Sequence, residues 1–472
     1  MFGSMLDLIL KRKSVIDLVL DLYNEQNGPV YGIFDQRQPV FLVRDPELLK
    51  QITVKDFDHF VNHRTVFGDD KDNLFGASLF MMKDSRWKDM RTTLSPAFTG
   101  SKMRQMFQLM NKVASGATDY LRQQQKKENP SQGLEIDVKN FVTRYSSDII
   151  ASTAFGIEVN SFENYNNEFY LTGKKVTTFT FSQNLKFFFY IHLRKLMKLL
   201  GIEFFDKKST EYFMSLVLDA MKYRKDHNII RPDMINMLME ARDMSNSDNP
   251  KPHSREWSDV DIVGQCFLFF FAGFETTASL TCLMAHEIME NSEIQEKLLQ
   301  EIQEAENSLD GKPLTYEVIQ NMRYMDMITS ETLRKWPVMS IIDRLCTQDI
   351  TYDLVNGQKL EIKKGDAILI PIAGLHRDPD NYERPDKFDP ERFSEENKDN
   401  IKPFTYMPFG IGPRNCIASR FALLETKVLI YYLLRDFLFQ PAKKSTIPLK
   451  IESNGFQLVP KNGFWLKFVS RH

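Results

Sequence analysis

A cysteine in a glycine-rich segment is the residue best suited to chemistry in this chain of 472 residues. The segment Phe409–Ala418 reads FGIGPRNCIA, and Cys416 stands just before an apolar stretch that predicts a helix to about Asp436. Glycines allow sharp bends and a close approach of the backbone to a flat ligand. At a helix N-terminus, open N–H groups and the helix dipole favour a thiolate over a thiol. Such a thiolate suits a haem iron that must cleave an O–O bond. The alternative is a structural cysteine.

A second stretch of interest interrupts an apolar helix that we expect over Val263–Leu283. Its centre, Ala272–Thr277, reads AGFETT. An acid and two threonines beside a glycine are poor choices for helix stability. A threonine hydroxyl can bond to the carbonyl one turn earlier, and such sites kink or widen helices. The pattern indicates either a notch in the helix or a buried helix with one satisfied polar patch.

Two further pairs have helical spacing. Glu331 and Arg334 are three residues apart, and Trp87 and Arg91 are four apart. Residues at these spacings share one face of a helix, so the Glu331 carboxylate can meet the Arg334 guanidinium. Most Glu–Arg pairs of this kind lie on the surface and contribute little to stability.

Composition excludes several classes of function. The net charge of −2 provides no basic cluster for nucleic acid. The four cysteines (Cys266, Cys282, Cys346 and Cys416) show no zinc-ligand spacing and indicate a reducing compartment. The 37 Phe and 22 Met residues suit either an adaptable apolar cavity or simply a large core. No run of about 20 apolar residues predicts a membrane span.

The elements that must position these residues are mostly helical. Ser14 can cap a helix to about Asn24, a hairpin is expected at Val30–Phe34 and Val40–Val43, and Glu47–Ile52 predicts a short helix behind Pro46. Helical patterns dominate from residue 85 to about 300, and short strands return at 352–370 and at the end of the chain. With no repeat and no low-complexity linker, the chain predicts one mainly α unit with a small β subdomain.

Taken together, the motifs resemble those of the cytochromes P450. Phe409–Ala418 matches the haem-loop pattern FxxGxRxCxG except at its last position, where Ala418 replaces glycine. The ExxR pair, the segment Phe388–Phe393 and AGFETT follow the family's pattern, and the resemblance runs from about residue 30 to the end. Asp56–Phe60, Arg91–Phe98 and AGFETT resemble insect microsomal P450s of the drug- and toxin-metabolising clan. Thr99–Arg104 is most similar to the insect family conventionally numbered nine.

The resemblance implies one cytochrome P450 catalytic domain over residues 1–472, enclosing haem b. Cys416 would be the iron ligand, and Glu331, Arg334 and Arg392 would form a structural network behind the cysteine loop. Glu275 and Thr276 would be catalytic residues that relay protons. The remaining haem-contact residues would be Trp87, Arg91, Ala272, Arg344, Phe409, Arg414 and Ala418. His376 lies near the propionates in many relatives, but we expect a surface histidine.

The resemblance also implies an apolar substrate site. The expected pocket residues, of which about half are expected to be ordinary core instead, are Phe75, Phe80, Phe269, Phe270, Phe274, Ile341 and Phe456. Such a site would oxidise foreign compounds such as plant toxins or insecticides. Alternatives within the fold are a peroxide isomerase or dehydratase and a haem sensor, and both are disfavoured by the intact Glu275–Thr276 pair.

Partners and location follow from the same resemblance. Electrons would come from NADPH–cytochrome P450 reductase, with cytochrome b5 as a second donor, docking near Lys88, Lys335 and Lys427. The apolar, basic stretch Leu185–Leu200 suits a membrane interface, with core packing as the alternative. We expect a monomer. We also expect it to be peripheral on the cytoplasmic face of the endoplasmic reticulum membrane, because a spanning helix and proline-rich hinge do not precede the domain in this sequence.

Overall fold

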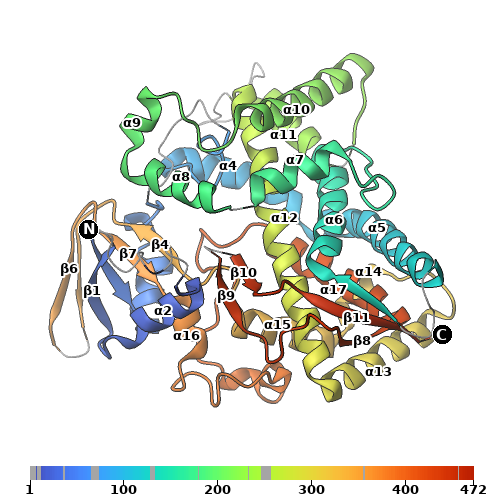
Figure 1. The fold of residues 1–472 in the computed structure, drawn as a ribbon. Helices are drawn as coiled ribbons and strands as arrows, with labels where there is room; N and C mark the ends of the chain where they lie inside the picture. The colour runs from blue at the N-terminus through green and yellow to red at the C-terminus, as the bar shows by residue number, and fades with distance from the viewer. Residues whose placement is uncertain are drawn as a thin grey trace. The chain divides into compact units, whose positions relative to one another are not determined.

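The structure is a computed structural model, and it describes residue 7 and residues 12–35, 38–64, 74–127, 133–178, 180–231, 233–245, 257–354, 357–454 and 457–471 (Figure 1). The chain divides into two compact units. Unit 1 comprises Met1–Arg64, Arg323–Ser419 and Thr446–Lys461, and unit 2 comprises Thr65–Met322, Arg420–Ser445 and Asn462–His472. The single domain expected from the sequence stays a prediction.

Unit 1 contains a four-stranded sheet built from segments far apart in the chain. The hairpin β1 (Val30–Asp35) and β2 (Gln38–Val43) is antiparallel, β2 runs parallel to β7 (Ala367–Ile370), and β4 (Ile342–Leu345) is antiparallel to β7. In Figure 1 the blue strand β1 and the orange strands β7 and β4 belong to this sheet, whose order is β1-β2-β7-β4. All four residues of β7 are buried, as expected for an inner strand.

The remaining elements of unit 1 are short, apart from two longer helices. They are α2 (Val15–Asn24), α3 (Pro46–Lys50), the π-helical turn η2 (Gln51–Lys55), η3 (Phe57–His59), α15 (Arg323–Lys335), α16 (Ile372–Arg377), η6 (Pro390–Phe393), η7 (Lys398–Asn400), and the strand pairs β5 (Ile350–Asp353) with β6 (Lys359–Ile362) and β9 (Ile451–Asn454) with β10 (Gln457–Pro460). Their core includes Leu49, Ile52, Phe60 and Ile370.

Unit 2 is almost entirely helical. Its helices are α4 (Asp84–Leu94), η4 (Ser95–Phe98), α5 (Gly100–Lys127), α6 (Val138–Ile150), η5 (Ala151–Phe155), α7 (Glu168–Thr177), α8 (Phe181–His192), α9 (Arg194–Leu199), α10 (Lys207–His227), α11 (Met234–Ser245), α12 (Asp259–Glu290), α13 (Ser292–Leu309), α14 (Tyr316–Asn321) and α17 (Ser419–Asp436). A small antiparallel sheet has the order β3 (Leu134–Asp137), β11 (Trp465–Ser470) and β8 (Phe437–Pro441).

Helix α12 is the longest described helix and packs against α6, α7, α10 and α11. A capping box at Ser258 and Asp261 starts it. Phe267, Phe270 and Phe274 project from one face, as their spacing requires, and are buried. By length and composition α12 could cross a membrane, but 61% of its apolar window is buried inside the protein, which is typical of a core helix.

Most predicted elements are confirmed. Ser14 caps α2, the hairpin forms at β1 and β2, and the mainly α architecture with small sheets is present. Two helices differ in extent. α12 begins before and ends after the predicted Val263–Leu283. The short helix behind Pro46 continues as η2 to Lys55, where the Thr53 hydroxyl bonds to the Leu49 carbonyl at 2.6 Å.

Candidate active site

The cysteine loop of unit 1 is a folded turn structure. Gly410 and Gly412 have φ of +72° and +70°, a region that favours glycine. A Cβ at Gly412 would lie 2.0 Å from the Thr53 carbonyl oxygen, so only glycine fits there. The Cys416 N–H donates to the Phe409 carbonyl at 2.8 Å, which closes the loop. Cys416 thus stands three residues before α17 begins.

Exposure distinguishes Cys416 from the other cysteines. Cys266, Cys282 and Cys346 are buried, whereas Cys416 is exposed. Burial raises the pKa of the Cys282 thiol to about 12 and also raises that of Cys266, so these thiols stay protonated and apolar. Among the four, Cys416 alone is placed to offer its sulfur to a ligand.

Basic side chains gather beside this loop within unit 1. Arg344 is 1% exposed and donates to the carbonyls of Asp343 (2.7 Å) and Ile411 (3.3 Å). Its Nε has no hydrogen-bond partner among the described residues. Burial lowers the pKa of Arg344 to about 10. Arg414 donates from Nε to the Val61 carbonyl at 2.7 Å. A buried guanidinium with an open N–H is suited to a carboxylate ligand.

His63 belongs to the same basic group, and the sequence did not single it out. Its Nδ1 lies 3.1 Å from the Asp343 carbonyl and 3.2 Å from the Asp343 carboxylate. Burial lowers the pKa of His63, and the charges of Arg344 and Arg414 act in the same direction. His63 belongs to no motif, and the one signal for it in the sequence is its place next to Arg64.

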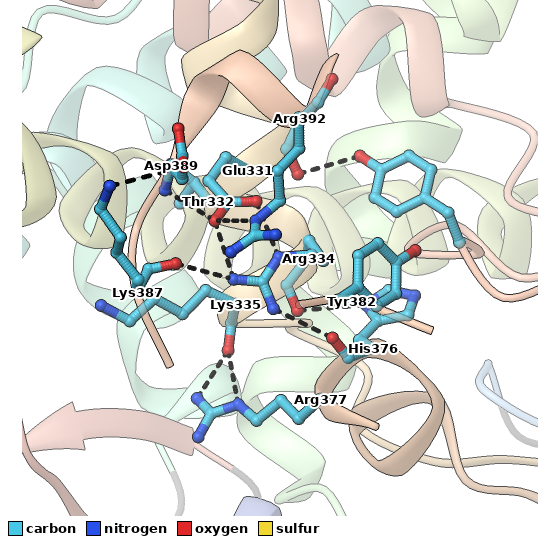
Figure 2. Close-up of polar contacts among 12 residues, drawn as sticks. Glu331, Thr332, Arg334, Lys335, His376, Arg377, Tyr382, Lys387, Asp389 and Arg392 are labelled. Carbon is cyan, nitrogen blue, oxygen red and sulfur yellow. Dashed lines mark hydrogen bonds and ion pairs between the residues drawn. The ribbon is translucent and has the colours of Figure 1, made fainter. Parts of the chain in front are cut away.

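Glu331, Arg334 and Arg392 come together in unit 1 (Figure 2). Arg334 donates from Nε and Nη2 to the two Glu331 oxygens at 2.7 and 2.8 Å, and both side chains are fully buried. Arg392 Nε lies 3.5 Å from Glu331 Oε1. Such a buried, bidentate pair differs from an ordinary surface ion pair, because each charge depends on the other for compensation.

The Glu331–Arg334 pair also bonds to the backbone of α16 and of the loop just before η6. Glu331 accepts from the Asp389 N–H at 2.9 Å, and Arg334 donates to the carbonyls of His376 and Lys387 at 3.0 and 3.3 Å. The pair therefore organises the residues between α16 and η6, which precede the cysteine loop in the chain.

His376 corrects an expectation, because it is fully buried and is not a surface histidine. Nδ1 lies 3.2 Å from the Arg334 carbonyl, and Nε2 accepts from the Met407 N–H at 2.9 Å. These partners require a neutral ring with the proton on Nδ1. Burial and the Arg334 charge lower the pKa of His376 to about 3. The ring thereby connects α15 to the segment just before the cysteine loop.

The centre of α12 in unit 2 is polar where the sequence predicted it. The Thr276 hydroxyl bonds back to the Ala272 carbonyl at 2.6 Å. Glu275 Oε1 lies 2.7 Å from Lys139 Nζ on α6, and the same amine donates to Ser279 at 2.9 Å. Ala272 is exposed although most of α12 is buried. Lys139 is a partner that the sequence could not reveal, since it lies 136 residues away.

Trp87 and Arg91 lie on α4, one turn apart. Trp87 is 4% exposed and Arg91 is partly exposed. Arg91 is in the last turn of α4, where a cation interacts favourably with the helix dipole.

The predicted pocket residues divide into two groups. Phe270 and Phe274 are core residues, and the Phe270 ring packs 4.9 to 5.1 Å from Phe213 and Phe169. Phe75 is buried as well, whereas Phe269 and Ile341 are partly buried and Phe80 is 41% exposed. Phe456 lies outside the described residues.

Lys427, expected at a docking surface, is buried on α17. It is 3% exposed, and Nζ donates to the Ile319 carbonyl at 3.1 Å. It cannot serve as a surface charge, whereas Lys88 is exposed and Lys335 is partly exposed.

Comparison with known proteins assigns the chain to a family. The cytochrome P450 family model matches residues 1–467, and the chain belongs to the cytochrome P450 family. It is 58% identical to probable cytochrome P450 9f2 of Drosophila melanogaster, over 100% of this chain and 92% of that protein. It is 42% identical to cytochrome P450 9e2 of Blattella germanica, over 99% and 91% respectively. Identity to cytochrome P450 3A11 of Mus musculus is 37%, over 94% and 85%.

These matches confirm the resemblance to the insect P450 family nine and establish the class of enzyme. The protein is a cytochrome P450 mono-oxygenase, an oxidoreductase whose family binds haem b and generally works with NADPH–P450 reductase. Residues of this chain fit that cofactor. Cys416 is an exposed thiol before a helix, and the open Nε of buried Arg344 suits a propionate.

Proposed function

We propose that Cys416 ligates the haem iron as a thiolate and that Trp87, Arg91, Arg344 and Arg414 bind the propionates. The observation that supports this assignment is the exposed position of Cys416 on a loop that packs through Gly412 against Thr53. Phe409, Ala272 and Ala418 would contact the porphyrin. The Glu331–Arg334–Arg392 network would hold the segment before the loop, which is a structural role.

Glu275 and Thr276 are the proposed acid and hydroxyl of the site. When bound, haem supplies the activation of dioxygen for transfer of one oxygen atom to substrate. The protein must deliver protons to that reaction, and a positioned carboxyl and hydroxyl can do so. Lys139 holds the Glu275 carboxylate at 2.7 Å and so fixes its place on α12.

The proposed substrates are apolar foreign compounds such as plant toxins or insecticides. Phe75, Phe80, Phe269 and Ile341 are the described candidates for contacts with them. Aromatic side chains bind apolar molecules by excluding water and impose few directional requirements. Broad selectivity follows from that chemistry.

The proposed electron donors are NADPH–P450 reductase and, as an alternative donor, cytochrome b5. Lys88 is the most suitable of the predicted docking residues, since it is exposed, Lys335 is partly exposed and Lys427 is buried. The protein would act as a monomer.

Membrane attachment is proposed through α8 and α9, at the cytoplasmic face of the endoplasmic reticulum. Leu193, Leu196, Leu199 and Leu200 are 45%, 46%, 83% and 60% exposed. Exposed leucines gathered in one segment favour insertion at a membrane interface. The side chains of Phe187 and Phe188 lie outside the described residues.

Liposome flotation tests the membrane proposal. Replacing Leu196, Leu199 and Leu200 by serine should reduce binding to liposomes. The control is Ile230→Ser, which removes one apolar side chain as exposed as that of Leu199 (82% and 83%) from the loop after α10. Unchanged flotation of the triple variant, or an equal loss in the control, would contradict the proposal.

The ligand assignment is tested by spectroscopy and turnover. Reduced protein with carbon monoxide should absorb at about 450 nm, the signature of thiolate ligation. Cys416→Ala should lose this band, while Cys346→Ala, which removes a buried cysteine, should keep it. NADPH consumption with reductase and a panel of apolar compounds then tests the proposed electron donor and substrates. A band retained in Cys416→Ala would overturn the assignment.

A further inference from the structure

A buried glutamine on α12 holds the loop that precedes α4. Gln265 is fully buried, and its Oε1 accepts from the Leu79 N–H at 2.7 Å. Its Nε2 donates to the Ala77 carbonyl and to the Asp261 carbonyl of its own helix, both at 2.9 Å. One side chain therefore satisfies a donor and an acceptor of residues 74–82, called here the 74–82 loop.

The neighbouring residue on α12 lets this loop approach closely. A Cβ added at Gly264 would lie 2.8 Å from the Leu74 carbonyl oxygen and 3.1 Å from the Ala77 Cβ. Both distances are shorter than ordinary van der Waals contact, so a side chain at residue 264 would push the loop away. Glycine at 264 and glutamine at 265 together seat the 74–82 loop on α12.

The 74–82 loop carries two of the proposed substrate contacts, Phe75 and Phe80. The Phe75 ring lies 5.4 Å from that of Phe271 on α12 and 5.8 Å from that of Phe205, just before α10. These ring contacts hold the Phe75 side chain, but they bond no backbone group of the loop. The two hydrogen bonds to Gln265 are directional, and they fix the register of the loop on the helix.

We propose that Gln265 is a latch whose paired hydrogen bonds hold the 74–82 loop on α12 and thereby limit the rate at which apolar ligands enter and leave. This inference rests on the proposed function, because Gln265 would control how fast ligands reach the substrate site proposed there. Gln265 is a positioning residue, since it acts through the loop that carries Phe75 and Phe80.

Removing the latch should favour the released loop for a simple reason. In Gln265→Leu the Leu79 N–H and the Ala77 carbonyl lose their partners while they stay buried. An unsatisfied buried polar group is costly, and release to water removes that cost. Leucine is apolar and a good helix former, so α12 itself should tolerate the change.

The chain offers a matched control in Gln295 on α13. Its Nε2 donates to the Phe439 carbonyl at 3.1 Å, and its Oε1 accepts from the Phe439 N–H at 2.8 Å. Gln295→Leu thus removes the same two kinds of hydrogen bond from a buried glutamine, but it acts on β8 and not on the 74–82 loop. Both variants should lower thermal stability, and only Gln265→Leu should release the 74–82 loop.

Hydrogen exchange in the intact chain provides a readout that does not depend on activity. The N–H groups of Met81 and Met82 bond to the Ser78 carbonyl inside the loop, so the substitution leaves their acceptor in place. Their exchange should be about tenfold faster in Gln265→Leu, if the lost pair is worth about one hydrogen bond net. Exchange there should be unchanged in Gln295→Leu. Equal rates in wild type and Gln265→Leu, or equal acceleration in the control, would overturn the latch.

Ligand exchange tests the gate itself. Phenylimidazole binding to the haem-loaded protein can be followed by stopped-flow absorbance. Association and dissociation should both accelerate in Gln265→Leu, by a similar factor of about ten, with little change in Kd. Carbon monoxide is much smaller, and its rates should change less. Unchanged phenylimidazole rates would remove the gating role. Failure of the proposed function itself would instead show as a wild-type protein without a 450 nm band.

Gly264→Ala is a second test, independent of whether Gln265→Leu folds. Alanine suits a helix better than glycine does, so α12 should not weaken. Its Cβ would displace the Leu74 carbonyl while Gln265 remains. Faster exchange at Met81 and Met82 is expected here too, and wild-type exchange in this variant would contradict the close seating of the loop.

Discussion

Arg334 and His376 hydrogen-bond to each other's backbone carbonyl. The Arg334 guanidinium donates to the His376 carbonyl at 3.0 Å, and the His376 ring donates from Nδ1 to the Arg334 carbonyl across 3.2 Å. The second ring nitrogen accepts from Met407. The buried Arg334 guanidinium and the buried neutral His376 ring thus hold α15, α16 and the segment at Met407, just before the cysteine loop, together.

His376 should make stability depend on pH. Its pKa is lowered to about 3 in the folded protein from an ordinary value of 6.5, because burial and Arg334 disfavour the cation. Between these values only the unfolded chain binds the proton, so stability is lost as pH falls below 6.5. The slope from this group is about 1.4 kcal/mol per pH unit.

Urea unfolding at pH values from 7.5 to 5 would measure this slope. His376→Gln should be less stable at neutral pH, because the ring's contact with the Arg334 carbonyl is changed. Its stability should also fall less steeply with acidification than that of the wild type. Parallel pH profiles for the two proteins would show that His376 does not titrate as described.

The Glu331–Arg334 pair should be sensitive to loss of one partner. Glu331→Gln leaves the buried Arg334 charge without its carboxylate, at a cost of about 3–5 kcal/mol. We expect little folded, haem-containing protein, measured as the 450 nm band per mole of chain. The exposed pair Arg104 and Glu317 provides a control, since Glu317→Gln should leave haem content unchanged. Normal haem content in Glu331→Gln would contradict the structural role.

The sequence predicted local features well because their causes are local. Ser14 caps α2, Pro46 begins α3, and Gly410 and Gly412 take positive φ values for reasons visible in the sequence. Even the Glu331–Arg334 contact follows from a spacing of three on a helix.

Burial and distant partners could not be predicted in this way. His376 and Lys427 look like surface residues in the sequence, yet each is buried because a backbone group from another segment satisfies it. Lys139 meets Glu275 only because α6 packs on α12. Such contacts depend on the tertiary arrangement, and a single sequence contains no periodicity that reports them.

Thr276 should govern how well electron input is coupled to product. Thr276→Val removes the hydroxyl and its bond to the Ala272 carbonyl while keeping a similar shape. We expect NADPH consumption to continue with a lower yield of product, by a factor of about ten or more, because proton delivery loses its hydroxyl. Thr276→Ser should restore most of the yield. The haem spectrum checks that both variants fold, and full coupling in Thr276→Val would exclude the proposed role.

The fit between Gly412 and Thr53 should decide whether the cysteine loop can hold haem. Gly412→Ala combines two penalties: alanine at φ +70°, and a Cβ only 2.0 Å from the Thr53 carbonyl oxygen. Gly311→Ala is the matched control, because Gly311 has φ +74° with no atom within 4 Å of the added Cβ. The control should lose roughly 1–2 kcal/mol of stability from backbone strain and keep its haem. Gly412→Ala should lose haem as well, since the loop must move away from η2, and equal haem content in the two variants would show that the contact with Thr53 does not position Cys416.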